Sequence, residues 1–110
     1  MTWRGGCKCG AVAFEAKGTP AKLMSCNCSI CRPKGYLHWF VPEADFALEQ
    51  GAAALGQYEF NTHKLKHRFC LTCGVSPFVQ GPGTVAVNAR CLAGFDLESV
   101  PTEAFDGAAL

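Results

Sequence analysis

The chain has 110 residues and 49% of them are hydrophobic, including eight Phe, two Trp and two Tyr, a composition that excludes a disordered protein. This length is typical of one domain, so we expect residues 1–110 to form a single unit. The formal net charge of +1 gives no support for a nucleic-acid partner, and no apolar run approaches the ~20 residues that a membrane span needs.

Short alternations of apolar and polar residues, separated by Gly and Pro, predict β-strands with one buried and one exposed face. They occur at residues 12–15, 37–41, 57–60 and 85–89, with weaker candidates at 46–48 and 75–79. Pro77 favours an edge strand or a bulge for the last of these. The only helix-like stretch is 52–55, which glycines bound on both sides. The pattern predicts a mostly β domain, built from small antiparallel sheets.

Eight cysteines fall into three close groups and one single residue. The groups are Cys7-Lys8-Cys9, Cys26-Asn27-Cys28-Ser29-Ile30-Cys31 and Cys70-Leu71-Thr72-Cys73, and Cys91 stands alone. Two cysteines separated by one or two residues in a tight turn can direct both sulfurs to one point, as tetrahedral zinc requires. Gly10 and Gly74 each follow a group directly, where a glycine permits a turn with positive φ.

The spacing also predicts how the cysteines divide between metal ions. A closed site of four thiolates needs two pairs, so the economical partition joins Cys7 and Cys9 to Cys70 and Cys73. The remaining group supplies three ligands, namely Cys26, Cys28 and Cys31. Four cysteines are typical of structural zinc, and three protein ligands with an exchangeable fourth are typical of catalytic zinc. We therefore expect two zinc ions per chain, one structural and one labile.

Other uses of the cysteines stay open at this point. Four disulfides would suit a secreted domain, but the segment from Met1 to Cys7 has no apolar stretch like that of a secretory signal. We expect a cytoplasmic protein, in which thiols stay reduced and clustered cysteines favour metal over disulfides. One zinc site with idle thiols is a further alternative. An iron–sulfur cluster is a weaker one, because its cysteine runs are usually spaced differently.

Several single residues have both a plain and a functional interpretation. Cys91 is predicted to be a small buried apolar residue, or else to lie near the labile metal. His38 follows Cys31 by seven residues on a strand-like run, so it is a spare ligand or an ordinary surface or half-buried histidine. The basic run 61–68 is most simply a solvated strand or turn, and its functional interpretation is a binding edge for an acidic small molecule.

Four segments together resemble the glutathione-dependent formaldehyde-activating enzyme family. They are Gly6-Cys7-Lys8-Cys9-Gly10-Ala11-Val12-Ala13-Phe14, Cys26-Asn27-Cys28-Ser29-Ile30-Cys31-Arg32, His67-Arg68-Phe69-Cys70-Leu71-Thr72-Cys73-Gly74-Val75-Ser76-Pro77-Phe78 and Val87-Asn88-Ala89-Arg90-Cys91-Leu92. Parts are also similar to the centromere protein V branch, notably Cys28-Ser29-Ile30-Cys31, Asn61-Thr62-His63-Lys64 and Phe40-Val41-Pro42. The resemblance implies antiparallel sheets with zinc-binding hairpins, and the same division of the cysteines that their spacing predicts.

The resemblance also implies a reaction. Founding members of the family are described as making S-(hydroxymethyl)glutathione from glutathione and formaldehyde, which in reverse is a carbon–sulfur lyase reaction. Cys26, Cys28 and Cys31 would then be catalytic through the labile zinc. Glutathione carries two carboxylates, and Arg32, Lys34 and Arg90 are the candidate basic residues that would bind it. The alternatives are a lyase that acts on another thiol adduct, and a non-catalytic zinc interaction module.

Overall fold

The computed structural model describes residues 1–59 and 63–109, and it is mostly β with antiparallel sheets, as predicted. A three-stranded sheet has the order β1 (Thr2–Gly6), β2 (Ala13–Lys17) and β5 (Phe46–Gln50). A seven-stranded sheet has the order β10 (Thr102–Phe105), β3 (Leu23–Cys26), β4 (His38–Pro42), β9 (Thr84–Asn88), β8 (Phe78–Gly81), β7 (Lys66–Cys70) and β6 (Leu55–Tyr58). Only β10 and β3 pair in parallel among the described strands. Phe60, part of one expected strand, lies outside the described residues.

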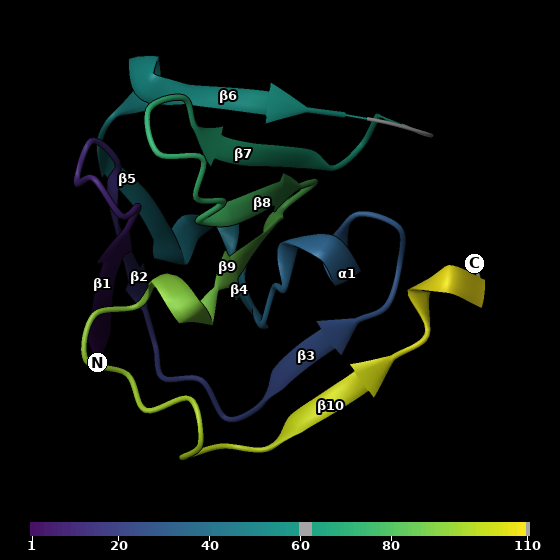
Figure 1. The fold of residues 1–110 in the computed structure, drawn as a ribbon. Coiled ribbons are helices and arrows are strands. Elements are labelled where there is room, and N and C mark those ends of the chain that lie inside the picture. Colours follow the sequence, from purple (N-terminus) through teal and green to yellow (C-terminus); the bar gives the residue numbers. More distant parts are fainter. Residues whose placement is uncertain (60–62, 110) are drawn as a thin grey trace.

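The main core lies where the small sheet packs against the large one. In Figure 1, β1, β2 and β5 lie on one side of the molecule, and β3, β10 and α1 (Cys31–Lys34) lie on the opposite side. Phe14 of β2 stacks on Phe46 with 5.3 Å between ring centroids, and Phe46 packs against Phe78 at 4.7 Å. These rings come from the apolar positions of three alternating strands, and burying them is the chief source of stability in so small a domain.

The second face of the large sheet is covered as well, contrary to the alternation in the sequence. Ala86 and Asn88 of β9 were expected to be exposed, but both are buried. A smaller apolar cluster forms on this face from Cys31, Tyr36, Val79 and Ala86. Because β9 lies in the interior of the sheet with both faces covered, its residues 85–88 are all buried, whether apolar or polar.

Two local predictions differ from the structure in detail. The helix-like stretch 52–55 forms a short 3-10 helix, η2 (Ala52–Ala54), which leads into β6. The short α-helix is α1, which begins at Cys31 and tolerates Pro33 because its first turn needs no backbone donor there. Pro77 does not mark an edge: β8 begins after it and lies between β9 and β7.

The remaining short elements are 3-10 turns, namely η1 (Glu43–Asp45), η3 (Ala89–Cys91) and η4 (Gly107–Ala109). Within residues 1–59 and 63–109, no helix has both the length and the apolar character needed to cross a membrane.

Candidate metal centres and adjoining cavity

Four cysteines from two hairpins meet at one end of the molecule. Cys7 and Cys9 lie in the turn between β1 and β2, Cys70 ends β7, and Cys73 lies in the turn that follows. Their sulfurs all lie within 4.8 Å of one another. The Cys7–Cys9 and Cys9–Cys70 Sγ distances are 3.6 and 3.7 Å, close to the ~3.8 Å edge of a tetrahedron with metal–sulfur bonds of 2.3 Å. The four thiols therefore fit a zinc ion.

Local backbone geometry explains why these two turns direct their cysteine sulfurs to one point. Gly10 has φ of 83° and Gly74 has φ of 81°, so both glycines adopt the left-handed conformation expected from their positions. The Val12 amide donates to Cys7 Sγ at 3.3 Å, which fixes the direction of that side chain. The Gly74 amide donates to the Cys70 carbonyl at 2.8 Å and closes the second turn.

Three cysteines form a second cluster on the other side of the sheet. Cys26 ends β3, Cys28 lies in the following turn, and Cys31 begins α1. Their sulfurs also lie within 4.8 Å of one another. The Cys31 amide donates to Cys28 Sγ at 3.4 Å, as in a turn that presents sulfurs to a metal. Three sulfurs in this arrangement fit a zinc ion that keeps one position for an exchangeable ligand.

His38 lies beside this second cluster and is buried, with only 4% of its surface exposed. Its Nε2 is 3.4 Å from Cys31 Sγ, while its Nδ1 is buried without a hydrogen-bond partner among the described residues. Burial, with the nearby His67, lowers the pKa of His38 to about 4, so the ring is neutral at physiological pH. His38 is thus no ordinary surface histidine, and the sequence alone could not choose between its two interpretations.

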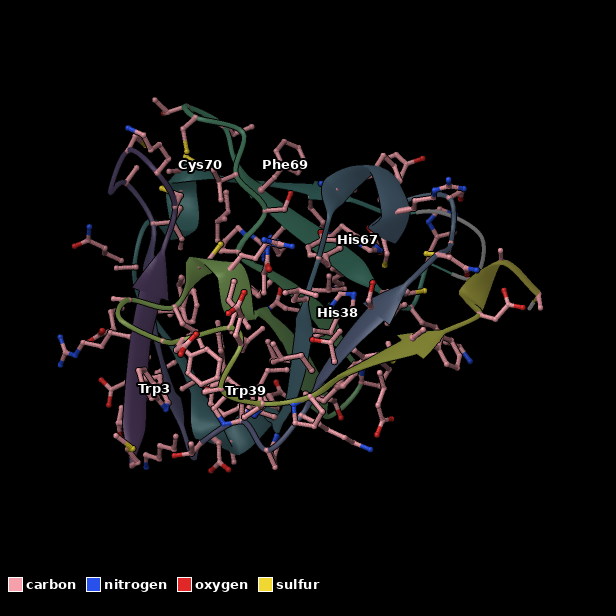
Figure 2. The ribbon with its side chains drawn as sticks, turned by 60° about the horizontal axis from the view of Figure 1, so that its bottom comes forward. Trp3, His38, Trp39, His67, Phe69 and Cys70 are labelled. Atoms are coloured by element: carbon pink, nitrogen blue, oxygen red, sulfur yellow. The ribbon has the colours of Figure 1, made fainter. Side chains whose placement is uncertain are left out.

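Aromatic rings surround His38. Tyr36 stacks on it with 4.7 Å between ring centroids, and Phe40 stacks on its other side at 5.7 Å. The Tyr36 hydroxyl lies 3.3 Å from His67 Nδ1. Figure 2 shows His38 and His67 close together and well away from Cys70. The expectation that the run 61–68 is solvated therefore fails at His67, which is buried on β7, while its residues 61 and 62 lie outside the described part of the chain.

A cavity of about 710 Å³ opens onto the three-cysteine cluster and not onto the four-cysteine cluster. Cys26, Cys28 and Cys31 lie at its lining together with His38 and His67. Most of the remaining surface is apolar and comes from Met24, Phe40, Leu65, Val79, Ala86 and Phe105. Among the described residues that line it, none is Asp, Glu, Lys or Arg.

The C-terminal segment completes this cavity, a contribution that no pattern in the sequence indicated. β10 pairs in parallel with β3, so Phe105 lies opposite Cys26. Asn27 holds the next residues, because its Nδ2 donates to Asp106 Oδ1 and its Oδ1 accepts from the Ala108 amide, both at 3.0 Å. Gly107 packs so closely against Cys26 Sγ that a side chain would not fit there.

Of the three basic residues expected to bind a substrate, Lys34 lines a smaller pocket that shares Ser29 and Ile30 with the large cavity. Arg32 and Arg90 are exposed, and Arg90 Nε donates to the Gly35 carbonyl at 3.0 Å. Lys34 lies 5.4 Å above the Phe69 ring, and its Nζ donates to Ser76 Oγ at 2.6 Å. Burial lowers the pKa of Lys34. None of the three is among the described residues that line the large cavity.

Cys91 belongs to neither cysteine cluster. It is half-buried in the turn η3 and packs against the main core. Burial, with further contributions from the nearby thiols of Cys7 and Cys73, raises the pKa of its own thiol to about 11. This environment matches the interpretation of Cys91 as a small apolar residue.

Comparison with known proteins agrees with this geometry. The family model described as "Glutathione-dependent formaldehyde-activating enzyme" matches residues 2–104. The chain belongs to this family. A crystal structure of a Rhodobacter sphaeroides protein is similar to it, with 34% sequence identity and a TM-score of 0.82. The match covers 90% of this chain and 98% of that one. The family resemblance of the four sequence segments is thereby confirmed, and the cysteine clusters of this family member are compatible with metal binding.

Proposed function

We propose that the chain binds two zinc ions and carries out carbon–sulfur chemistry on a glutathione–aldehyde adduct at the three-cysteine cluster. Cys7, Cys9, Cys70 and Cys73 would hold the structural ion, and Cys26, Cys28 and Cys31 the labile one. The observation that carries the proposal is that the three-cysteine cluster lines a large cavity, whereas the four-cysteine cluster does not. Membership of the family supports glutathione and formaldehyde as the reactants.

A zinc ion at the three-cysteine cluster would supply positive charge that favours the thiolate form of an incoming thiol. The protein would contribute position and surroundings. His38 holds Cys31 through its ring nitrogen at 3.4 Å, and the apolar lining excludes water from the reacting groups. In the forward direction a sulfur–carbon bond forms, the aldehyde carbonyl becomes a hydroxyl, and the thiol proton ends on that oxygen. The lyase direction reverses these changes, and neither needs an oxidant or a reductant.

Glutathione binding tests the proposal directly. A ligand that binds only the folded state stabilises it by ~2.7 kcal/mol at a hundredfold excess over its dissociation constant. Millimolar glutathione should therefore raise the melting temperature of the zinc-loaded protein by a few degrees. Cys28→Ser should remove this shift, because it removes one of three ligands to the labile ion.

S-methylglutathione is the matched control, because it has the same peptide without a free thiol. An equal shift with both compounds would mean that the peptide binds without metal chemistry, and no shift with glutathione would favour an interaction module. Since thiols and formaldehyde also react without a catalyst, turnover is measured against the uncatalysed rate and against Cys28→Ser.

A second candidate function is a lyase that acts on a different thiol adduct. It is favoured by the cavity itself, whose described lining offers no cation to the two carboxylates of glutathione.

A further inference from the structure

Three large apolar side chains that line the cavity are exposed to solvent. Phe40 is 51% exposed, Leu65 is 51% exposed and Phe105 is 42% exposed. They come from β4, from the approach to β7, and from β10, so three distant parts of the sequence place apolar surface around one opening. Leaving this surface in water is unfavourable, and such patches on small proteins mark ligand or partner sites.

The deeper part of the cavity lining is also mostly apolar. Val79 and Ala86 form the floor from β8 and β9, and Met24 adds a side chain from β3. The polar side chains in the lining are few, namely Ser29, His38, His67 and Thr84. A cavity of about 710 Å³ is within the ~300–1,000 Å³ range of small-molecule sites, and formaldehyde, with one carbon, would fill little of it.

Charge decides what can occupy this space. Glutathione carries two carboxylates and an ammonium group, and transferring a charged group to an apolar environment without a partner is costly. Because no charged side chain is found among the described lining residues, the peptide's charges would have to remain in water at the opening. An uncharged carbon group attached near the sulfur suits the interior.

From these observations we infer that the substrate is a thiol–aldehyde adduct with a bulky, uncharged, apolar substituent, which occupies this cavity while the sulfur lies at the three-cysteine cluster. This inference rests on the proposed function and narrows its substrate class. The substituent enters with either the aldehyde or the thiol, because each reactant contributes the carbon group at one end of the new sulfur–carbon bond. The bond that forms and the proton that moves are the same as in the proposed function.

The first test measures dissociation constants of simple thiols for the zinc-loaded protein by calorimetry. In the series ethanethiol, propanethiol and butanethiol, each added methylene should tighten binding about fourfold, because its burial contributes ~0.8 kcal/mol. 3-Mercaptopropanoate, which carries a carboxylate, should bind at least about tenfold more weakly than butanethiol.

Two matched variants test whether the cavity lining causes the dependence of thiol affinity on chain length. Leu65→Ala shortens an exposed side chain of the cavity and should flatten the dependence on chain length. Leu71→Ala shortens another exposed leucine, 63% exposed, that does not line the cavity, and should keep the wild-type slope. Equal slopes in the two variants, or a flat series in the wild type, would count against the thiol as the source of the apolar group.

The second test replaces the thiols with glutathione and a series of aldehydes, from formaldehyde to butanal and phenylacetaldehyde. The rate is divided by the uncatalysed rate for each aldehyde. A ratio that rises with apolar size assigns the substituent to the aldehyde, and a flat ratio beside a steep thiol series assigns it to the thiol. Flat results in both series overturn the inference while leaving Cys28-dependent glutathione binding intact. Conversely, a steep thiol series without glutathione binding overturns the proposed function alone.

Discussion

At the scale of single residues, His38 connects the three-cysteine cluster to the rest of the cavity. Its Nε2 faces Cys31 Sγ at 3.4 Å, and Tyr36 and Phe40 hold the ring on either side. Because the ring is neutral, the nitrogen that faces the sulfur can carry a proton and donate to a thiolate. Such a partner orients a metal ligand without touching the metal.

His38→Ala should therefore weaken zinc binding at the three-cysteine cluster by about 10- to 100-fold, the usual effect of removing a group that orients a ligand. Competition with a chromophoric chelator measures this affinity. His63→Ala is the control, because His63 is exposed and outside the cavity lining. An unchanged affinity in His38→Ala would show that the contact with Cys31 has no effect on the metal.

Cys91 should behave as a residue of the core. With its thiol pKa raised to about 11, little thiolate exists at pH 8, and alkylation by iodoacetamide should be slow. The rate should rise about tenfold per pH unit up to that pKa, because the thiolate fraction does so. Cys91→Ala should retain two zinc ions by metal analysis, and the loss of either ion would place Cys91 among the ligands.

At the scale of elements, Gly51 allows the end of β5 to lie close to the segment that follows Cys7 and Cys9. Its φ is 94°, and an added Cβ would clash with the Ala11 carbonyl oxygen and approach Val12 Cα to 2.8 Å. Val12 is the residue whose amide donates to Cys7 Sγ. The glycine thus permits a close approach of two chain segments behind the four-cysteine cluster.

Gly51→Ala should destabilise the protein by clearly more than the ~1–2 kcal/mol that a left-handed conformation costs an L-residue. Gly83→Ala separates the cost of the left-handed conformation from the cost of the steric clash, since Gly83 has φ of 71° but open space around its Cβ position. Thermal unfolding of the two variants in zinc-replete buffer measures the difference. Equal losses in melting temperature would mean that the contact with residues 11 and 12 adds nothing.

The elements that the sequence could predict were those with a strong local signal. Strand β4 and strand β9 follow from their apolar alternation, and the two cysteine clusters form as their spacing indicates. The parallel pairing of β10 with β3 depends on contacts across most of the chain and has no local pattern. The burial of His38 depends likewise on Cys31 and Tyr36, which pack on a face that the alternation marked as exposed.

At the scale of the whole molecule, the four-cysteine cluster joins a turn of the small sheet to a strand of the large sheet. Cys9 and Cys70 are 61 residues apart in the sequence. Cys9 lies in the turn between two strands of the small sheet, and Cys70 ends a strand of the large sheet. In a small domain, a metal that joins such distant segments contributes directly to the free energy of folding. The three cysteines of the other cluster span only 26–31 and lie close in the chain whether or not the rest is folded.

The two clusters should therefore differ in their effect on folding. The wild type purified under reducing conditions should contain close to two zinc ions per chain. Cys70→Ser should give unfolded or insoluble protein, and Cys28→Ser should remain folded and retain one ion. Circular dichroism together with metal analysis tests this, and a folded Cys70→Ser variant with two ions would refute the division of the cysteines.

The clasp between Asn27 and Asp106 also has a consequence for the newly made chain. Asp106 follows Asn27 by 79 residues. A ribosome that adds 5–20 residues per second therefore makes Cys26, Cys28 and Cys31 about 4–16 seconds before it makes the C-terminal segment that covers them. The cluster can therefore take up metal, or react with oxidants and aldehydes, before the cavity exists. The order of synthesis therefore leaves these three cysteines accessible to solvent before the segment that covers them is made.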